Sequence, residues 1–131
     1  MSRPVILSFN LSDSDILDLK GTAMKHGAEI RSVDISEYSL PIGVIASGIC
    51  AYHQTGEKKT CSEIPEKMIV VSNFGIAAYN TFLHEIKEKH LVKGALKARI
   101  CRKNIMWTPM KLYGELCYER QKYYSVKNMI N

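Results

Sequence analysis

Residues 5–35, VILSFNLSDSDILDLKGTAMKHGAEIRSVDI, contain the pattern that predicts the fold. A short apolar run opens this segment, an amphipathic stretch follows, and a second apolar run closes it. Ser12 is a suitable helix N-cap, because its hydroxyl can accept a hydrogen bond from the free backbone amide of Asp15. We therefore predict a strand, a helix that begins after Ser12, and a strand over residues 28–33. The residues that share one apolar helix face at helical spacing are Ile16, Leu19, Ala23 and Met24.

A second segment repeats this plan further along the chain, with Met68 in the place of Val5 and Tyr79 in the place of Ile16. Residues 68–100, MIVVSNFGIAAYNTFLHEIKEKHLVKGALKARI, again run from an apolar stretch through an Asn-apolar pair into a helical pattern. That helix is predicted over residues 77–90 and the strand after it over residues 95–101. Identity between the copies is low, so the repeat is one of structure. Two β-α-β units follow, and we expect an α+β sandwich of the ferredoxin-like βαββαβ type.

Residues 97–116, KARICRKNIMWTPMKLYGEL, are predicted to contain a strand, a polar turn and the start of an extra C-terminal helix. In the last strand, apolar residues alternate with Lys97, Arg99 and Cys101, which predicts one basic face. Thr108 caps the helix and Pro109 takes its first position, where proline is favoured. Gly114 inside the helix is unfavourable unless it permits close packing against a neighbour. We expect residues 125–131 to form a frayed tail.

The segment between the two copies is the least regular part of the chain. Residues 44–49 are apolar and fit either an added strand or a short helix. Residues 50–66 are polar and predict an exposed, mobile loop. With 131 residues in all, the chain has the length of a single domain over residues 1–131.

Charge is distributed unevenly along the chain, although the net charge is only +5. Residues 1–66 hold six Lys/Arg and nine Asp/Glu, whereas residues 67–131 hold twelve Lys/Arg and four Asp/Glu. Such a difference suggests an oriented surface, although neutral drift would produce it equally well. No apolar run approaches the ~20 residues that span a bilayer, and no signal peptide is recognisable. We therefore expect a cytoplasmic protein that does not enter a membrane.

The four cysteines predict neither a metal site nor a disulfide framework. None belongs to a CxxC pair, so free thiols are the expectation for a cytoplasmic protein. Cys117 falls in the helical pattern as a small core residue. No metal or other cofactor is predicted. The cysteines are Cys50, Cys61, Cys101 and Cys117.

The ending KARICRKNIMWT…LYGEL resembles the bacterial family catalogued as domain of unknown function 3783. The openings ILSFNLSDSDILDLK and IRSVDISEYSLPIG are similar to the family's N-terminal part, so the resemblance covers most of the chain. This sequence departs from the family pattern at Cys101, where the family commonly has a small hydroxyl residue. The resemblance implies lineage and fold and supplies no chemistry. Its C-terminal part rests on Ala98, Asn104, Trp107, Thr108, Leu112, Glu115 and Leu116.

Enzymatic and nucleic-acid functions are weighed against a binding role. The chain has no P-loop, GxGxxG, HExxH or GxSxG motif, and its four histidines are scattered, which disfavours an enzyme of a known class. An enzyme of unknown class stays one alternative. An RNA-recognition sheet would stack bases on aromatics, but its stacking positions hold Leu7 and Val70 instead. Non-specific nucleic-acid binding, through phosphate contacts of the basic C-terminal half, stays another alternative. The cations concerned are Lys93, Lys97, Arg99, Arg102 and Lys103.

We therefore predict a small binding or regulatory module that contacts a protein partner or a second copy of itself as a homodimer. A sheet with helices on one face would leave its other face or an edge free for this contact. Trp107 is predicted mainly to staple the start of the helix, and secondarily to anchor a partner. The predicted surface consists of Lys97, Arg99, Arg102, Lys103, Asn104 and Trp107.

Overall fold

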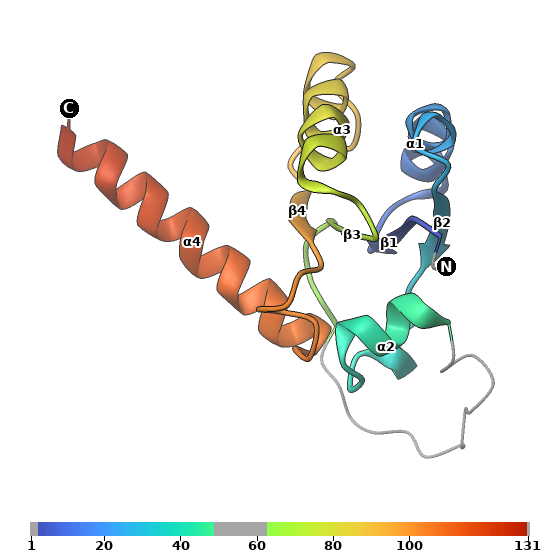
Figure 1. Ribbon diagram of the computed structural model, residues 1–131. Helices are drawn as coiled ribbons and strands as arrows, with labels where there is room; N and C mark the ends of the chain where they lie inside the picture. Colours follow the sequence, from blue (N-terminus) through green and yellow to red (C-terminus); the bar gives the residue numbers. More distant parts are fainter. Residues whose placement is uncertain (1–2, 49–62, 131) are drawn as a thin grey trace.

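The computed structural model describes residues 3–48 and 63–130. It is an α+β structure in which a four-stranded mixed sheet carries helices on both faces (Figure 1). The elements in chain order are β1 (Val5–Phe9), α1 (Asp13–Lys25), β2 (Glu29–Ser32), η1 (Ile35–Glu37), α2 (Ile42–Ser47), β3 (Met68–Ser72), α3 (Ile76–Glu88), β4 (Leu96–Arg99) and α4 (Pro109–Ile130).

The two predicted β-α-β units are confirmed, and a pseudo-twofold axis relates them. The predicted offset holds for strand and helix alike, since β1 and β3 begin at Val5 and Met68, and α1 and α3 begin at Asp13 and Ile76. β1 pairs with β3 in antiparallel fashion, and Leu7 lies opposite Val70, its equivalent in the second unit. The axis therefore passes through this residue pair.

The ferredoxin-like strand order is not the one found. The sheet has the order β2-β1-β3-β4, and each unit's second strand lies parallel beside its first. In a ferredoxin-like sheet β2 would instead lie beside β3, joined to it by a short hairpin. Here residues 33–67 separate β2 from β3, and their described part covers a face of the sheet. In each unit the helix connects two neighbouring strands: α1 connects β1 to β2, and α3 connects β3 to β4.

Both faces of the sheet are covered by the described residues, so the predicted open face does not exist. α1 and α3 lie side by side over one face, where Ile6, Ile69 and Val71 contact Leu19 and Phe82. The segment with η1 and α2, together with the start of α4, covers the opposite face (Figure 1). The second core contains Leu7, Phe9, Tyr38, Ile42, Ile45, Met68, Val70 and Leu112.

Local capping follows the sequence at both ends of α1. The Ser12 hydroxyl accepts from the Asp15 amide at 3.1 Å, and the Asp15 carboxylate accepts from the Ser12 amide, which completes a capping box. Gly27 follows the helix with φ 62°, a conformation that glycine adopts without steric cost. The capping box thus fixes the start of α1, and the Gly27 turn leads the chain from α1 into β2.

The segment after β2 forms a short helix, which is one of the two predicted alternatives for residues 44–49. α2 docks on the turn before α4, because the Ile42 amide donates to the Trp107 carbonyl at 2.7 Å. The Gly43 amide donates to the Ile105 carbonyl at 3.0 Å. Most of the predicted mobile loop, residues 50–66, lies outside the described residues. Its end, residues 63–66, leads into β3 and includes the buried Ile64.

α4 begins where predicted and is much longer than the surface beneath it. The Thr108 hydroxyl accepts from the Lys111 amide at 3.3 Å, and Pro109 opens the helix. Figure 1 shows the helix running away from the sheet toward its C-terminal end. A Cβ at Gly114 would meet nothing within 4 Å, so the predicted close packing there is wrong for the described residues. Residues 125–130 belong to the helix, and fraying there stays a prediction. In the described part of the chain, no helix is both long and apolar enough to cross a membrane.

Candidate functional site

The predicted basic residues of β4 face α3 instead of an open surface. Lys97 and Arg99 are each half-buried, while Leu96 and Ala98 on the alternate side contact the opposite core. The Lys97 ammonium donates to the Ala95 carbonyl at 3.0 Å, and the Arg99 guanidinium donates to the Phe74 carbonyl at 3.3 Å. The alternation predicted for this strand is confirmed.

The predicted turn after β4 has one structural residue and two exposed cations. The Asn104 side chain is buried, accepts from the Cys101 amide at 2.9 Å and donates to the Arg99 carbonyl at 3.0 Å. These two bonds close the turn. Arg102 and Lys103 are exposed on it.

Trp107 is half-buried and packs against the core that contains Leu112, a residue of the first turns of α4. The Lys111 ammonium lies 5.2 Å from the centre of its ring, within the range of a cation–π contact. These contacts agree with the helix-stapling role. Partner anchoring by Trp107 stays a prediction.

Four of the six predicted residues line one small cavity of about 220 Å³ between β4, the turn and α4. They are Lys97, Lys103, Asn104 and Trp107. Glu115 and Glu119 line the same cavity, so acidic and basic groups offset each other there. Arg99 and Arg102 do not line it. The predicted residues therefore do not form one continuous basic surface.

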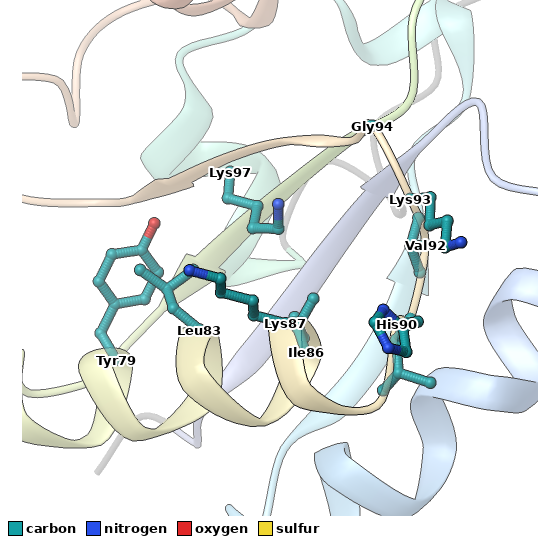
Figure 2. Close-up of a pocket in the computed structure, with 10 residues that line it drawn as sticks. Tyr79, Leu83, Ile86, Lys87, His90, Val92, Lys93, Gly94 and Lys97 are labelled. Carbon is teal, nitrogen blue, oxygen red and sulfur yellow. The ribbon is translucent and has the colours of Figure 1, made fainter.

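A larger cavity, of about 490 Å³, lies on the other side of Lys97 and was missed by the sequence prediction. We call it the α3–β4 pocket; Figure 2 shows its lining, which comes from α3, the loop after it and β4. Three lysines and a histidine share the lining with apolar side chains, and it contains no Asp or Glu. It is lined by Tyr79, Leu83, Ile86, Lys87, His90, Leu91, Val92, Lys93, Gly94 and Lys97.

Burial changes the ionisation of two groups in the α3–β4 pocket. Desolvation lowers the pKa of Lys97, because its ammonium is held partly away from water. Desolvation also raises the pKa of Tyr79 to about 12, against an opposing effect of the Arg99 charge. The Tyr79 hydroxyl therefore stays protonated at neutral pH and can donate a hydrogen bond. None of the ion pairs among residues 3–48 and 63–127 includes Lys87, Lys93 or Lys97.

A separate polar cluster joins α4 to Glu66, which lies two residues before the start of β3. Glu66 accepts from Arg120 at 2.8 and 3.0 Å and from the Tyr113 hydroxyl at 2.8 Å. The half-buried Cys117 thiol lies 3.7 Å from the same carboxylate, so it is a partner of this cluster and not of the apolar core. The Arg120 and Tyr113 hydrogen bonds lower the pKa of Glu66 from 4.5 to about 2.

Glu66→Gln is expected to lower the free energy of unfolding at pH 7 by about 1 kcal/mol, since a partly exposed ion pair contributes modestly. Glu66 has a depressed folded-state pKa, so its contribution is present above pH 4.5 and is lost as the pH falls toward 2. Urea unfolding of both proteins between pH 7 and pH 2 tests this. The difference between them should shrink below pH 4.5; a constant difference would contradict the assignment.

The remaining chemistry-bearing residues do not assemble into a further site in the described residues. Cys101 and Cys117 are free thiols, whereas Cys50 and Cys61 lie outside the described residues. No group of three or more His, Cys, Asp or Glu residues in the described part of the chain is arranged to hold a metal ion. Comparisons with models of known protein families, with curated proteins and with solved structures give no match.

Proposed function

We propose that the protein is a small binding or regulatory module that associates with a second copy of itself through α4. The observation that carries this proposal is the length of α4 beyond the body of the molecule. Residues 121–127 are all exposed, whereas Leu112, Tyr113 and Leu116 pack against the core beneath the first half of the helix. Isolated helices shorter than ~12–15 residues are marginal in water, so the projecting half needs a covering surface.

The projecting half carries apolar and aromatic side chains that suit a helix partner. Tyr123 is 63% exposed and Val126 is 49% exposed. Both continue the line of Leu112 and Leu116 at the spacing of three and four residues that is typical of a coiled-coil seam, with Glu119 at the intervening position. The stripe that packs on the protein's own core thus extends past that core. Tyr118 and Tyr124 add further exposed aromatic surface.

Charge along α4 favours a second copy in antiparallel orientation. Glu115 and Glu119 are exposed in the half near the sheet together with one lysine, Lys111, whereas the exposed charges of residues 121–127 are the lysines Lys122 and Lys127. When two such helices run antiparallel, the acidic half of each lies beside the basic half of the other. Glu115 and Glu119 of each helix then lie nearer the lysines of the projecting half of the other than they would in a parallel pair, which favours the antiparallel orientation.

The double variant Tyr123→Ser/Val126→Ser is expected to convert the dimer to a monomer, because it removes the apolar surface beyond the core. Size-exclusion chromatography with light scattering over a range of protein concentrations measures the mass. Leu17→Ser is the matched control, since Leu17 is 65% exposed on α1, away from α4. It should leave the dimer intact. The wild-type dimer should also weaken at high salt, because salt screens exposed charges.

Two results would contradict this assignment. One is a wild-type protein that stays monomeric at every concentration tested. The other is a dimer whose mass is unchanged in the double variant, which would place the contact elsewhere. Circular dichroism of the variant shows whether the body of the protein is still folded.

Non-specific nucleic-acid binding along a continuous basic face receives less support from the geometry. The five cations that suggested it are divided between the α3 side of β4, the loop before β4 and the turn after it. Lys97 and Arg99 each donate to a backbone carbonyl and are half-buried. Membership of the family of domain of unknown function 3783 is likewise proposed. What supports it is that Ala98, Asn104 and Leu112, among the residues of the resemblance, are buried.

A further inference from the structure

The α3–β4 pocket exists because the second β-α-β unit has a longer connection than the first. Residues 26–28 join α1 to β2, whereas the longer segment 89–95 joins α3 to β4. Most of that segment, from His90 to Gly94, lines the pocket. Each pocket residue on α3 or β4 can therefore be compared with the residue at the equivalent position of α1 or β2 in the first unit.

The cations of the pocket are specific to the second unit. α1 and α3 align from Asp13 and Ile76, so Lys87 corresponds to Met24. β2 and β4 align from Glu29 and Leu96, so Lys97 corresponds to Ile30. Fold requirements shared by the two units therefore do not explain the two lysines, because the first unit folds with apolar residues at both places.

The loop is held in an unfavourable backbone conformation. His90, Val92 and Gly94 have φ values of 54°, 41° and 78°, in the left-handed region. A β-branched residue such as valine rarely adopts this region, and such outliers concentrate at functional sites. Val92 is nevertheless buried in the core beside Ala95, and the Leu91 amide donates to the Ile86 carbonyl at 3.0 Å. The loop is thus fixed to the body, and the pocket is preformed.

The lining combines positive charge with an apolar wall. Figure 2 shows Lys87 extending from α3 and Lys97 from β4, with Tyr79 and Leu83 beside them. Leu83 and Leu91, each half-buried, supply apolar surface, and the Tyr79 hydroxyl supplies a donor. A cavity of about 490 Å³ has the size of a small-molecule site. Such a lining suits a ligand with an anionic end and an apolar body.

We propose that the α3–β4 pocket binds a small organic phosphate, whose phosphoryl group contacts Lys87 and Lys97 and whose apolar body lies against Leu83 and Leu91. A phosphate monoester carries about −1.5 to −2 charges at pH 7, which two or three lysines balance better than a single carboxylate charge would. Lysine binds phosphate as a compact point charge, whereas carboxylates are recognised more often by the arginine fork. A bound phosphate would also compensate the cost of holding the Lys97 ammonium partly out of water.

Titration with phenyl phosphate, followed by calorimetry and by two-dimensional amide NMR, tests this proposal. We expect saturable binding with shifts concentrated at residues 79–97. Lys97→Met and Lys87→Met should each weaken binding about tenfold or more, because each removes a charge-assisted contact while keeping an apolar stem. Lys20→Met makes the same charge change outside the pocket, at the position equivalent to Leu83, and should stay within about twofold of wild type.

Three further ligands separate the parts of the proposal. Inorganic phosphate should bind more weakly than phenyl phosphate; equal affinity would overturn the apolar contact. Benzoate should also bind more weakly; equal affinity would overturn the choice of phosphate. Phenol should not bind measurably, and binding as tight as that of phenyl phosphate would overturn the role of the lysines. Absence of saturable phenyl phosphate binding to the wild type would overturn the whole proposal.

The variants also need a test of folding, which thermal unfolding supplies. Lys87 is exposed on α3, so Lys87→Met decides the question by itself if Lys97→Met does not fold. Unchanged phenyl phosphate affinity in a folded Lys87→Met protein would overturn the location. Tyr123 and Val126 do not line the pocket, so the double variant that tests the dimer leaves the lining of the pocket intact.

Discussion

Phe82→Ala is expected to lower the free energy of unfolding by about 3 to 5 kcal/mol, because it leaves a large cavity in a closely packed core. Phe82 is fully buried on the inner face of α3. Its ring centre lies 5.5 Å from that of Phe74 and 5.8 Å from that of His26, both in edge-on geometry. The His26 contact joins the two β-α-β units, so the substitution weakens their packing as well as one helix.

Ile76→Ala on the same helix is the matched control for Phe82→Ala. Ile76 is 66% exposed, so its truncation should change the free energy of unfolding by less than about 0.5 kcal/mol. Urea unfolding monitored by circular dichroism measures both variants. Similar losses for the two would mean that α3 does not bury Phe82 as described. Tyr79 and Leu83 flank Phe82 on α3, so the variant should also lose phenyl phosphate binding if that binding occurs in the α3–β4 pocket.

Gly43→Val is expected to lower the free energy of unfolding by about 2 to 3 kcal/mol, because α2 touches the turn before α4 at this residue. A Cβ at Gly43 would lie 2.5 Å from Ile105 Cγ1 and 3.0 Å from the Ile105 carbonyl oxygen. The side chain of Ile105 can rotate, but its carbonyl accepts from the Gly43 amide and cannot withdraw without breaking that bond. The larger side chain therefore separates α2 from the start of α4.

Gly114→Ala is the opposite case and serves as the control for Gly43→Val. Gly114 lies within α4 with open space around its Cα, so alanine should raise stability by about 0.5 to 1 kcal/mol through helix propensity. Thermal unfolding of the two variants should therefore shift in opposite directions. A destabilised Gly114→Ala protein would contradict the open space described around this residue.

The proposed ligand pocket lies on the α3 side of β4, and α4, which carries the proposed dimer contact, begins on the other side of this strand. Lys97 separates the α3–β4 pocket from the smaller cavity that Glu115 and Glu119 also line. These two glutamates are the acidic half of α4 in the proposed antiparallel contact. A ligand that contacts Lys97 would thus lie close to the charges that orient the dimer. Comparing the dimer dissociation constant with and without phenyl phosphate would measure any coupling between the sites.

Sequence patterns predict correctly wherever the deciding interactions are local. The Ser12 cap, the Gly27 turn and the Thr108-Pro109 helix start depend on residues within one helical turn of each other. The alternation in β4 identifies the two sides of that strand correctly. It leaves open which side meets α3, because a period of two distinguishes faces and does not identify what covers them.

The candidate site is predicted only in part, for a related reason. Trp107, Asn104, Lys103 and Lys97 are close in sequence, and they do line one cavity. The helical pattern places Lys87 on an outward face, and nothing local connects it to Lys97. The available signal is the comparison of the two copies, which shows a longer connection before β4 and lysines where the first copy has Met24 and Ile30.

Residue patterns alone establish the two β-α-β units, the apolar character of β1 and β3, and the added helix α4. β1 and β3 are apolar at nearly every position because both of their faces are buried, and this is a property of composition. The strand order, the covering of the second face by α2 and α4, and the placement of Lys87 and Lys97 in one pocket emerge only when the chain is folded. Those features depend on pairings between residues far apart in the chain, whose free energies come from packing and from the length of the connections, not from any local pattern.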